Sequence, residues 1–164
     1  MWNMGISNVY QFIKFGSTFG VLVSVLTLQG CVRMMLPTSD VELVTKSING
    51  GGSVEVPLDY VQSYANLKQA YIKCMEYRTL NDSLKIDAYL DRENSIGTFY
   101  GRPPYGTYIF KTTITPINSN TSKLTLYTIR GSLLTDNANQ NVLNKRLEQD
   151  KIRALGQDAK CNKD

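Results

Sequence analysis

Histidine is absent from the 164 residues of this chain. Histidine is the commonest general base near neutral pH and a frequent metal ligand, so a Ser-His-Asp or Cys-His catalytic site is excluded. The few cysteines, without any histidine, do not readily complete a tetrahedral zinc site. We therefore expect no metal and no cofactor. Because no nucleophile motif is present either, we do not expect an enzyme.

Charge is nearly absent from the first thirty residues, which hold no acidic side chain and one basic side chain, Lys14. An apolar run follows over residues 15–28. Its most apolar part, residues 19–28, suits the hydrophobic region of a signal peptide, about 7–15 residues long, and is short for a membrane span of about 20. The sequence therefore predicts that the chain is exported.

The apolar run ends in four residues, Leu28, Gln29, Gly30 and Cys31. An apolar stretch closed by small residues and then a cysteine resembles the lipobox of bacterial lipoproteins. The resemblance implies that the Cys31 thiol receives a diacylglyceryl group and that residues 1–30, a signal peptide, are then cut off. Leu28, Gln29 and Gly30 are the signal-recognition residues that the resemblance implies.

The residue after the cysteine bears on which membrane holds the protein. In the sorting system of such lipoproteins an aspartate at that position retains the protein in the inner membrane, whereas Val32 stands here. The resemblance thus implies an outer-membrane lipoprotein that faces the periplasm. An uncleaved anchor over residues 10–32 is an alternative, although it places Lys14 and Gln29 in or near hydrocarbon at a cost. Ordinary secretory cleavage is a further alternative.

The lipobox also decides how the other two cysteines are interpreted. If Cys31 is lipidated, Cys74 and Cys161 remain as an even pair in a chain exported to an oxidising compartment, where disulfides persist. We therefore predict a Cys74–Cys161 disulfide. The alternative is that Cys74 is a buried free thiol and Cys161 lies in a loose tail.

The chain after residue 30 is long enough for one domain and short for two. We expect a tether over residues 31–40 and a single domain over residues 41–164. Setting Lys14 apart from the eighteen basic residues leaves seventeen against fourteen acidic ones, a net charge of +3. The basic residues are scattered, and nucleic-acid binding is not expected because it requires a concentrated basic patch.

The periodicity of apolar residues predicts two helices and several strands. Asp59 is a predicted N-cap, and the stripe of Tyr60, Tyr64, Leu67, Tyr71 and Cys74 predicts an amphipathic helix over residues 60–75. A second helix is predicted over residues 139–155, with Gly156 just after it and with an inner stripe made by Val142, Leu143, Leu147, Ile152 and Leu155. Alternating or β-branched segments predict strands over residues 41–48, 53–56, 84–91, 96–101, 108–115 and 123–130, with a polar turn over residues 116–122.

This order of elements predicts an α+β fold rather than a parallel sheet. We expect an antiparallel sheet of four or five strands with two helices packed on one face, preceded by the signal or anchor helix. The plan resembles helix-grip domains, including those in the lipoprotein of the outer-membrane barrel-assembly machinery. It also resembles small uncharacterised outer-membrane lipoproteins. The resemblance concerns element order alone, so no function is transferred from it.

Four groups of residues are candidate sites. Asp87, Asp91 and Glu93 are predicted to be solvated rather than catalytic, and the glycines at 50–52 lack the Lys-Ser/Thr of a phosphate-binding loop. The ten tyrosines are mostly expected in the core. The best binding candidate is the loop made by Arg102, Pro103, Pro104 and Tyr105, where a stiff diproline lowers the entropy cost of recognition, although a plain connector is the simpler interpretation.

The sequence therefore predicts a lipid-anchored envelope protein with a structural, binding or assembly role. Its partners would be the membrane, through the lipid on Cys31, and an envelope protein. The alternative is a carrier or sensor that holds a small apolar ligand between helix and sheet, in a cavity lined by tyrosines.

Overall fold

The structure, a computed structural model, describes residues 36–130, 135–158, 160 and 161. Contacts between Cα atoms group Leu36–Asp164 in one compact unit. The signal helix, the residues Leu28, Gln29 and Gly30, and the lipidation site Cys31 lie outside the described residues. The lipobox therefore stays a prediction.

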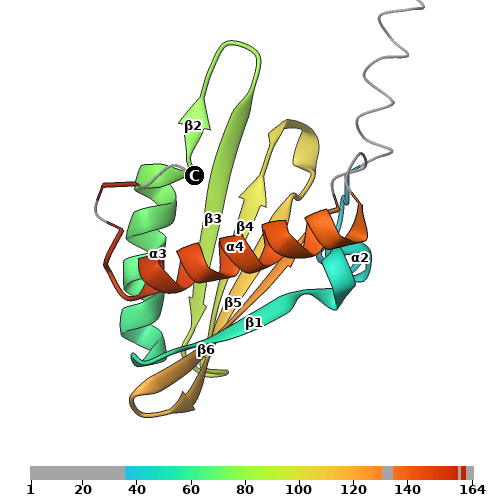
Figure 1. The fold of residues 1–164 in the computed structure, drawn as a ribbon. Helices are drawn as coiled ribbons and strands as arrows, with labels where there is room; N and C mark the ends of the chain where they lie inside the picture. Colours follow the sequence, from blue (N-terminus) through green and yellow to red (C-terminus); the bar gives the residue numbers. More distant parts are fainter. Residues whose placement is uncertain (1–35, 131–134, 159, 162–164) are drawn as a thin grey trace, which may run out of the picture. The chain divides into compact units, whose positions relative to one another are not determined.

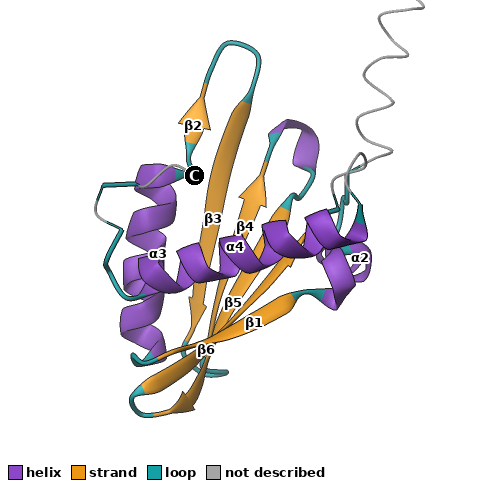
Figure 2. Cartoon of the chain, viewed as in Figure 1, coloured by secondary structure: helices purple, strands orange, loops and turns teal. Residues whose placement is uncertain are grey.

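Six strands form one antiparallel sheet, and two long helices lie across the same face of it (Figures 1 and 2). The spatial order is β1 (Gly52–Val56), β6 (Thr121–Thr128), β5 (Phe110–Asn118), β4 (Ile96–Arg102), β3 (Ser83–Asp91) and β2 (Tyr77–Arg78). The helices are α3 (Tyr60–Cys74) and α4 (Asp136–Ala154). The predicted α+β class with two helices on one face is confirmed, and the two-residue strand β2 makes the sheet larger than expected.

Helix α3 forms where the sequence predicts it. The Asp59 carboxylate accepts hydrogen bonds from the backbone N–H groups of Val61 and Gln62, which satisfies two donors that a helix start leaves unpaired. Tyr64, Leu67 and Tyr71 recur at spacings of three and four and are all buried. The apolar stripe therefore faces the sheet, as periodicity requires.

Residues 41–48 were predicted to be a strand, and this is wrong: they form most of α2 (Asp40–Lys46) and the start of a 3-10 turn, Ile48–Gly50. Ser39 caps α2 by accepting a hydrogen bond from the Glu42 N–H. An ion pair of 2.6 Å joins Glu42 to Lys46 one turn later. These local contacts favour a helix, and the apolar residues of the segment never alternated cleanly.

The predicted polar turn over residues 116–122 is also wrong. Strand β5 continues to Asn118 and β6 begins at Thr121, with Pro116 opposite Ser122 in the ladder. A proline is tolerated there because β4 pairs with β5 only as far as Ile114, so one edge of β5 is open beyond that residue.

The inner stripe of α4 differs from the prediction. Leu143 and Leu147 are buried, and Leu155 packs against the core. Val142 and Ile152 are 50 % and 37 % exposed, so they face outward. Their predicted places are taken by polar residues whose burial depends on partners from other elements, namely Gln149, Asp150 and Arg153.

Candidate functional site

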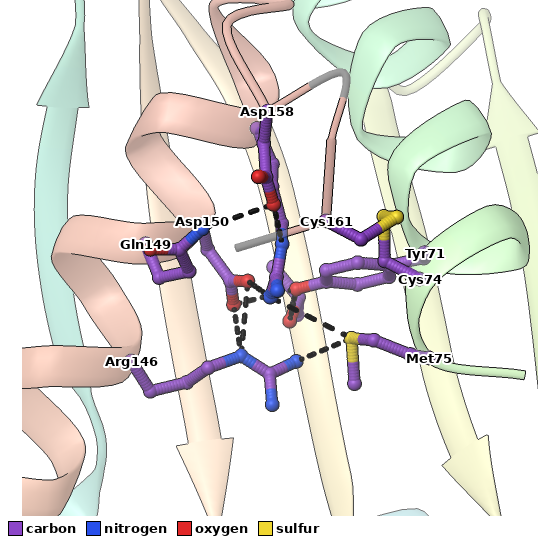
Figure 3. Close-up of polar contacts among 10 residues, drawn as sticks. Tyr71, Cys74, Met75, Arg146, Gln149, Asp150, Asp158 and Cys161 are labelled. Carbon is purple, nitrogen blue, oxygen red and sulfur yellow. Dashed lines mark hydrogen bonds and ion pairs between the residues drawn. A yellow bond between two sulfur atoms is a disulfide. The ribbon is translucent and has the colours of Figure 1, made fainter. Parts of the chain in front are cut away.

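A buried ionic network lies between α4, α3 and the sheet (Figure 3). The Asp150 side chain is completely buried. Its carboxylate accepts a hydrogen bond of 2.6 Å from the Tyr71 hydroxyl. It also accepts bonds of 2.9 Å from Arg146 Nε and 3.1 Å from Arg153 Nη1. A buried carboxylate is stable only when its oxygens are satisfied in this way.

The network continues through a second carboxylate. Asp158 accepts hydrogen bonds of 2.9 Å from Arg153 Nε and from Gln149 Nε2. Two aspartates therefore face two arginines, and the charges balance within the group. We call Tyr71, Arg146, Gln149, Asp150, Arg153 and Asp158 the interior network.

Tyr71 joins the interior network to the sheet. Its hydroxyl lies 2.9 Å from the Thr112 hydroxyl of β5 as well as bonding to Asp150. Burial, followed by the negative charge of Asp150, raises the pKa of Tyr71 well above its ordinary range. The phenol therefore stays protonated and donates to the carboxylate. This arrangement holds a proton firmly and does not transfer one near neutral pH.

Aromatic rings occupy the space between α3 and the sheet. Tyr64 stacks on Phe99 with centroids 4.8 Å apart, and Tyr71 meets the edges of Phe99 and Phe110. Strand β4 must carry a glycine beneath Tyr64, because a Cβ at Gly97 would lie 2.6 Å from the tyrosine ring. The two buried tyrosines of α3 thus pack against other rings.

Cys74 and Cys161 lie at disulfide distance, in the pairing that the sequence predicts (Figure 3). Their Cα atoms are 5.2 Å apart, and 87 positions separate them in the sequence. The bond joins the last residue of α3 to the segment after α4, beside the interior network. It therefore fastens both helices at the same end.

The outer face of the sheet carries a different set of residues. Strand register places Asp87, Tyr100, Lys111 and Tyr127 in one row on the face away from the core. Tyr100 meets Tyr89 and Tyr108 edge to face, with centroids 6.2 and 5.4 Å apart. Tyr89, Tyr100 and Tyr108 thus form a row of aromatic rings on the sheet surface, which we call the aromatic row.

Cations lie over this aromatic row. The Arg102 guanidinium is 4.9 Å from the Tyr108 centroid, and Lys111 Nζ is 5.7 Å from the Tyr100 centroid. Both cations also have carboxylate partners: Asp87 lies 3.2 Å from Arg102, and Asp40 lies 2.8 Å from Lys111. Arginine and tyrosine are among the residues enriched in binding hot spots.

Asp87 and Tyr100 on the outer face have shifted pKa values. A hydrogen bond from Lys85, together with one from Arg102, lowers the pKa of Asp87 despite its partial burial. Burial and the neighbouring Asp40 carboxylate raise the pKa of Tyr100 to about 12. The carboxylate stays ionised and the phenol neutral at physiological pH, so the surface has a fixed pattern of charge.

The predicted binding loop lies at one end of the outer face. Arg102 is the last residue of β4, and Pro103 leads into a 3-10 turn, Pro104–Gly106. The loop and β3 enclose a cleft of about 260 Å³, lined by Ser83, Lys85, Asp87, Arg102, Pro103, Pro104 and Gly106. Tyr105 stands outside the cleft lining and is 67 % exposed.

Tyr105 also has an unusual backbone. Its φ is +74°, in the left-handed region that a bulky side chain rarely occupies. Such a conformation costs of order 1–3 kcal/mol unless the surroundings compensate it. Its exposed ring gains little burial in return. The chain therefore holds an aromatic ring in solvent against its own conformational preference.

The interior network was not predicted from the sequence. Its signal was present, because Arg146, Asp150 and Arg153 are spaced at i, i+4 and i+7 and so share one side of a helix. The same spacing is typical of solvated salt bridges. Only the partners from α3 and from the tail distinguish the two cases.

Among the described residues, no group of three or more histidine, cysteine, aspartate or glutamate side chains is arranged to hold a metal. Within the same residues, no helix combines the length and apolar character that crossing a membrane requires.

No protein-family model matches the chain, and no curated protein matches it. Solved structures with a similar fold include an uncharacterised protein from Bacillus thuringiensis, at 14 % identity and a TM-score of 0.37, over 65 % of this chain and 94 % of that one. The protein XoxI from Bacillus cereus is similar at 15 % identity and a TM-score of 0.37, over 65 % and 92 %. A START superfamily protein from Mycobacterium smegmatis is similar at 12 % identity and a TM-score of 0.39, over 65 % and 92 %. These likenesses concern the fold alone and carry no argument about function.

Proposed function

We propose that this protein is a lipid-anchored protein of the cell envelope that binds a partner through the outer face of its sheet. The lipid on Cys31 would hold it to the outer membrane, with the domain in the periplasm. The pairing of the cysteines supports the anchor, and the exposed ring of Tyr105 independently supports the binding surface.

The cysteines support the anchor. Cys74 and Cys161 pair with one another, as expected of a chain in an oxidising compartment. Cys31 is then the one cysteine left over, and it stands at the end of the lipobox-like segment. A lipid on Cys31 gives that cysteine a role that no disulfide partner in this chain supplies.

The exposed ring of Tyr105 is the observation that carries the binding role. A strained, solvent-exposed aromatic costs stability without contributing to packing, so a contact outside the domain is the role that best fits Tyr105. Pro103 and Pro104 stiffen the loop, which lowers the entropy lost when a partner is bound. Arg102, Tyr108 and Tyr89 extend the same surface along the sheet.

A carrier of an apolar ligand needs an open volume between helix and sheet. Tyr64, Tyr71 and Phe99 occupy that region, and the interior network joins α4 to it. The cleft beside Arg102 lies on the outer face, and a more open hollow of about 700 Å³ lies at the edge of the sheet, lined by Ile72 of α3 together with Tyr77 and Leu84. The geometry therefore favours recognition at the surface over storage in the interior.

The anchor is tested by mass spectrometry of the protein extracted from membranes. A mature chain that begins at Cys31 and carries a diacyl or triacyl group is expected, and a Cys31→Ser variant should be neither processed nor anchored in this way. An intact Met1, or normal processing and anchoring of the variant, would contradict the anchor.

The binding surface is tested by photo-crosslinking in intact cells. A benzoyl-phenylalanine at position 105 should form a discrete adduct, whereas the same probe at position 142 is the control, because Val142 is about as exposed but lies on α4. Tyr105→Asn removes the ring and introduces a residue that tolerates the left-handed conformation. Partner binding should therefore fall about tenfold, while the free energy of unfolding stays unchanged. Equal adducts at both positions would contradict the proposal. A stoichiometric apolar molecule retained in native mass spectrometry would favour the carrier.

A further inference from the structure

Strand β3 has an open edge over most of its length. Strand β2 pairs only with Ser83 and Leu84, whereas residues 85–91 pair with β4 on the other side. Among the residues that the structure describes, none adds a strand to that part of β3. This side of residues 85–91 therefore has no strand partner within the described part of the chain, and the Glu76 side chain covers it at Ile86.

The hydrogen bonds show which backbone groups point to the open edge. The Ile86 N–H is bonded at 2.8 Å to a Glu76 side-chain oxygen, which lies away from β4. Gly101, opposite Ile86, directs its carbonyl to Ile109 instead. Because N–H and C=O groups alternate sides along a strand, Ala88 and Leu90 also direct theirs to the open edge.

We infer that a second copy of this chain pairs with this edge, antiparallel and centred on Ala88. In this register Ala88 faces the partner's Ala88, and Ile86 faces the partner's Leu90. All three outward-directed residues of each strand then lie in hydrogen-bonded pairs. The dimer is isologous, because each strand uses the same residues in both directions.

Charge supports the same register. On the outer face, Lys85 stands opposite the partner's Asp91, and Asp87 stands opposite the partner's Tyr89. Each copy thus supplies a cation for the other's carboxylate and a phenol donor for the other's aspartate. Opposite charges that face each other across two strands stabilise the pairing, and like charges destabilise it.

Neighbouring registers are disfavoured by the same side chains. A shift of one pair toward β2 places Asp87 opposite the partner's Asp87. It also requires the backbone of Leu84 to pair with the partner strand, although Leu84 already pairs with Tyr77. A shift the other way places Asp87 opposite the partner's Asp91. The register centred on Ala88 alone avoids both a like-charge pair and the edge that β2 occupies.

The ends of the paired segment fit this arrangement. The partner's Asp91, the last residue of its β3, lies opposite Lys85, so the partner strand stops where β2 begins. Pairing replaces the Glu76 oxygen at the Ile86 N–H with the partner's Leu90 carbonyl.

Sedimentation of the purified full chain in detergent tests the dimer, with charge reversal as the decisive comparison. Lys85→Asp and Asp91→Lys each place like charges opposite one another twice per dimer, so each should weaken dimerisation about tenfold or more. The double variant K85D/D91K exchanges the two charges and should restore dimerisation to within about threefold of the original. A purely structural effect of either change would not be reversed by the other.

Ala88→Pro is the second test. It removes an N–H that points to the open edge and breaks no bond within the sheet, so the monomer should keep its circular dichroism while the dimer is lost. A chain that sediments as a monomer at all accessible concentrations would overturn the inference. So would a dimer that is indifferent to both the charge reversals and the proline.

Discussion

The two faces of the sheet use the same kinds of side chain for opposite purposes. On the inner face, Tyr71 and Asp150 are shut away from water, Arg146 is partly exposed, and the Asp150 carboxylate accepts hydrogen bonds from both neighbours. On the outer face, Tyr100, Asp87 and Arg102 make similar contacts at the solvent boundary. The inner contacts are costly to break and fix the fold, whereas the outer contacts are weakly held and can be exchanged for contacts to a partner.

Loss of the disulfide should be the largest effect within the inner layer. Replacing both Cys74 and Cys161 with serine frees a loop of 87 positions in the unfolded chain, which costs about 4–5 kcal/mol in the chain-entropy model. Urea unfolding of the oxidised chain and of the variant measures the difference. An unchanged midpoint would mean that the helices are held together by packing alone.

The same substitution made on each face should separate the two layers most clearly. Asp150→Ala removes a fully buried carboxylate that accepts from Tyr71, Arg146 and Arg153, so the free energy of unfolding should fall by about 3 kcal/mol even though Arg153 keeps Asp158 as a partner. Asp87→Ala removes an ion pair whose cations remain in water, so the loss should be about 1 kcal/mol or less. Equal losses in chemical denaturation would contradict the contrast between the faces.

Removal of one phenol hydroxyl from each face gives a finer comparison. Tyr71→Phe loses a hydrogen bond to a buried carboxylate and leaves Thr112 without that neighbour, for an expected loss of about 2 kcal/mol. Tyr100→Phe loses only a long bond of 3.3 Å to Asp40, so the expected loss is about 0.5 kcal/mol. The ring contacts remain in both variants, so thermal unfolding reports on the hydroxyl.

The smallest effects should appear in the pH dependence of Tyr100 on the outer face and of Glu42 in α2. The pKa of Tyr100 is raised to about 12. The neutral phenol therefore contributes its full share of the folding stability below the ordinary pKa near 10, and this share is lost as the pH rises toward 12. Hydrogen bonds from Lys46 and Thr38 lower the pKa of Glu42 to about 2, so the start of α2 is stabilised above the ordinary value and loosens as pH falls from about 4.5 toward 2. NMR titration of the two residues checks both directions; shifts of the opposite sign would contradict the contacts described.

Residue spacing and capping residues predicted those helices and strands that are specified by contacts within a single segment. The Asp59 cap and the stripe of α3 follow from residue spacing, and so does the alternation of β3. Residues 41–48 were mistaken for a strand because a short apolar segment carries little periodicity, and the Ser39 cap decides its conformation. Pro116 was predicted to lie in a turn because a proline is tolerated in a strand only where no neighbouring strand needs its N–H, and the sequence does not show that β4 pairs with β5 only as far as Ile114.

The two candidate sites also differ in how far each could be predicted from the sequence. The loop from Arg102 to Tyr105 was visible in the sequence through its prolines and its aromatic residue. Its cleft depends on Lys85 and Asp87, which come from another strand. The interior network was missed because burial of Asp150 is justified only by Tyr71 and the arginines around it.

The sequence by itself determined the α+β class, the helix that Asp59 begins, and the pairing of Cys74 with Cys161. Those features depend on spacing along the chain and on residue chemistry. The tertiary structure alone decided that α4 turns Asp150 and Arg153 inward, that tyrosines line both faces of the sheet, and that β3 keeps an open edge. The physical reason is that burying a charge, or leaving a strand edge free, depends on partners supplied by distant segments.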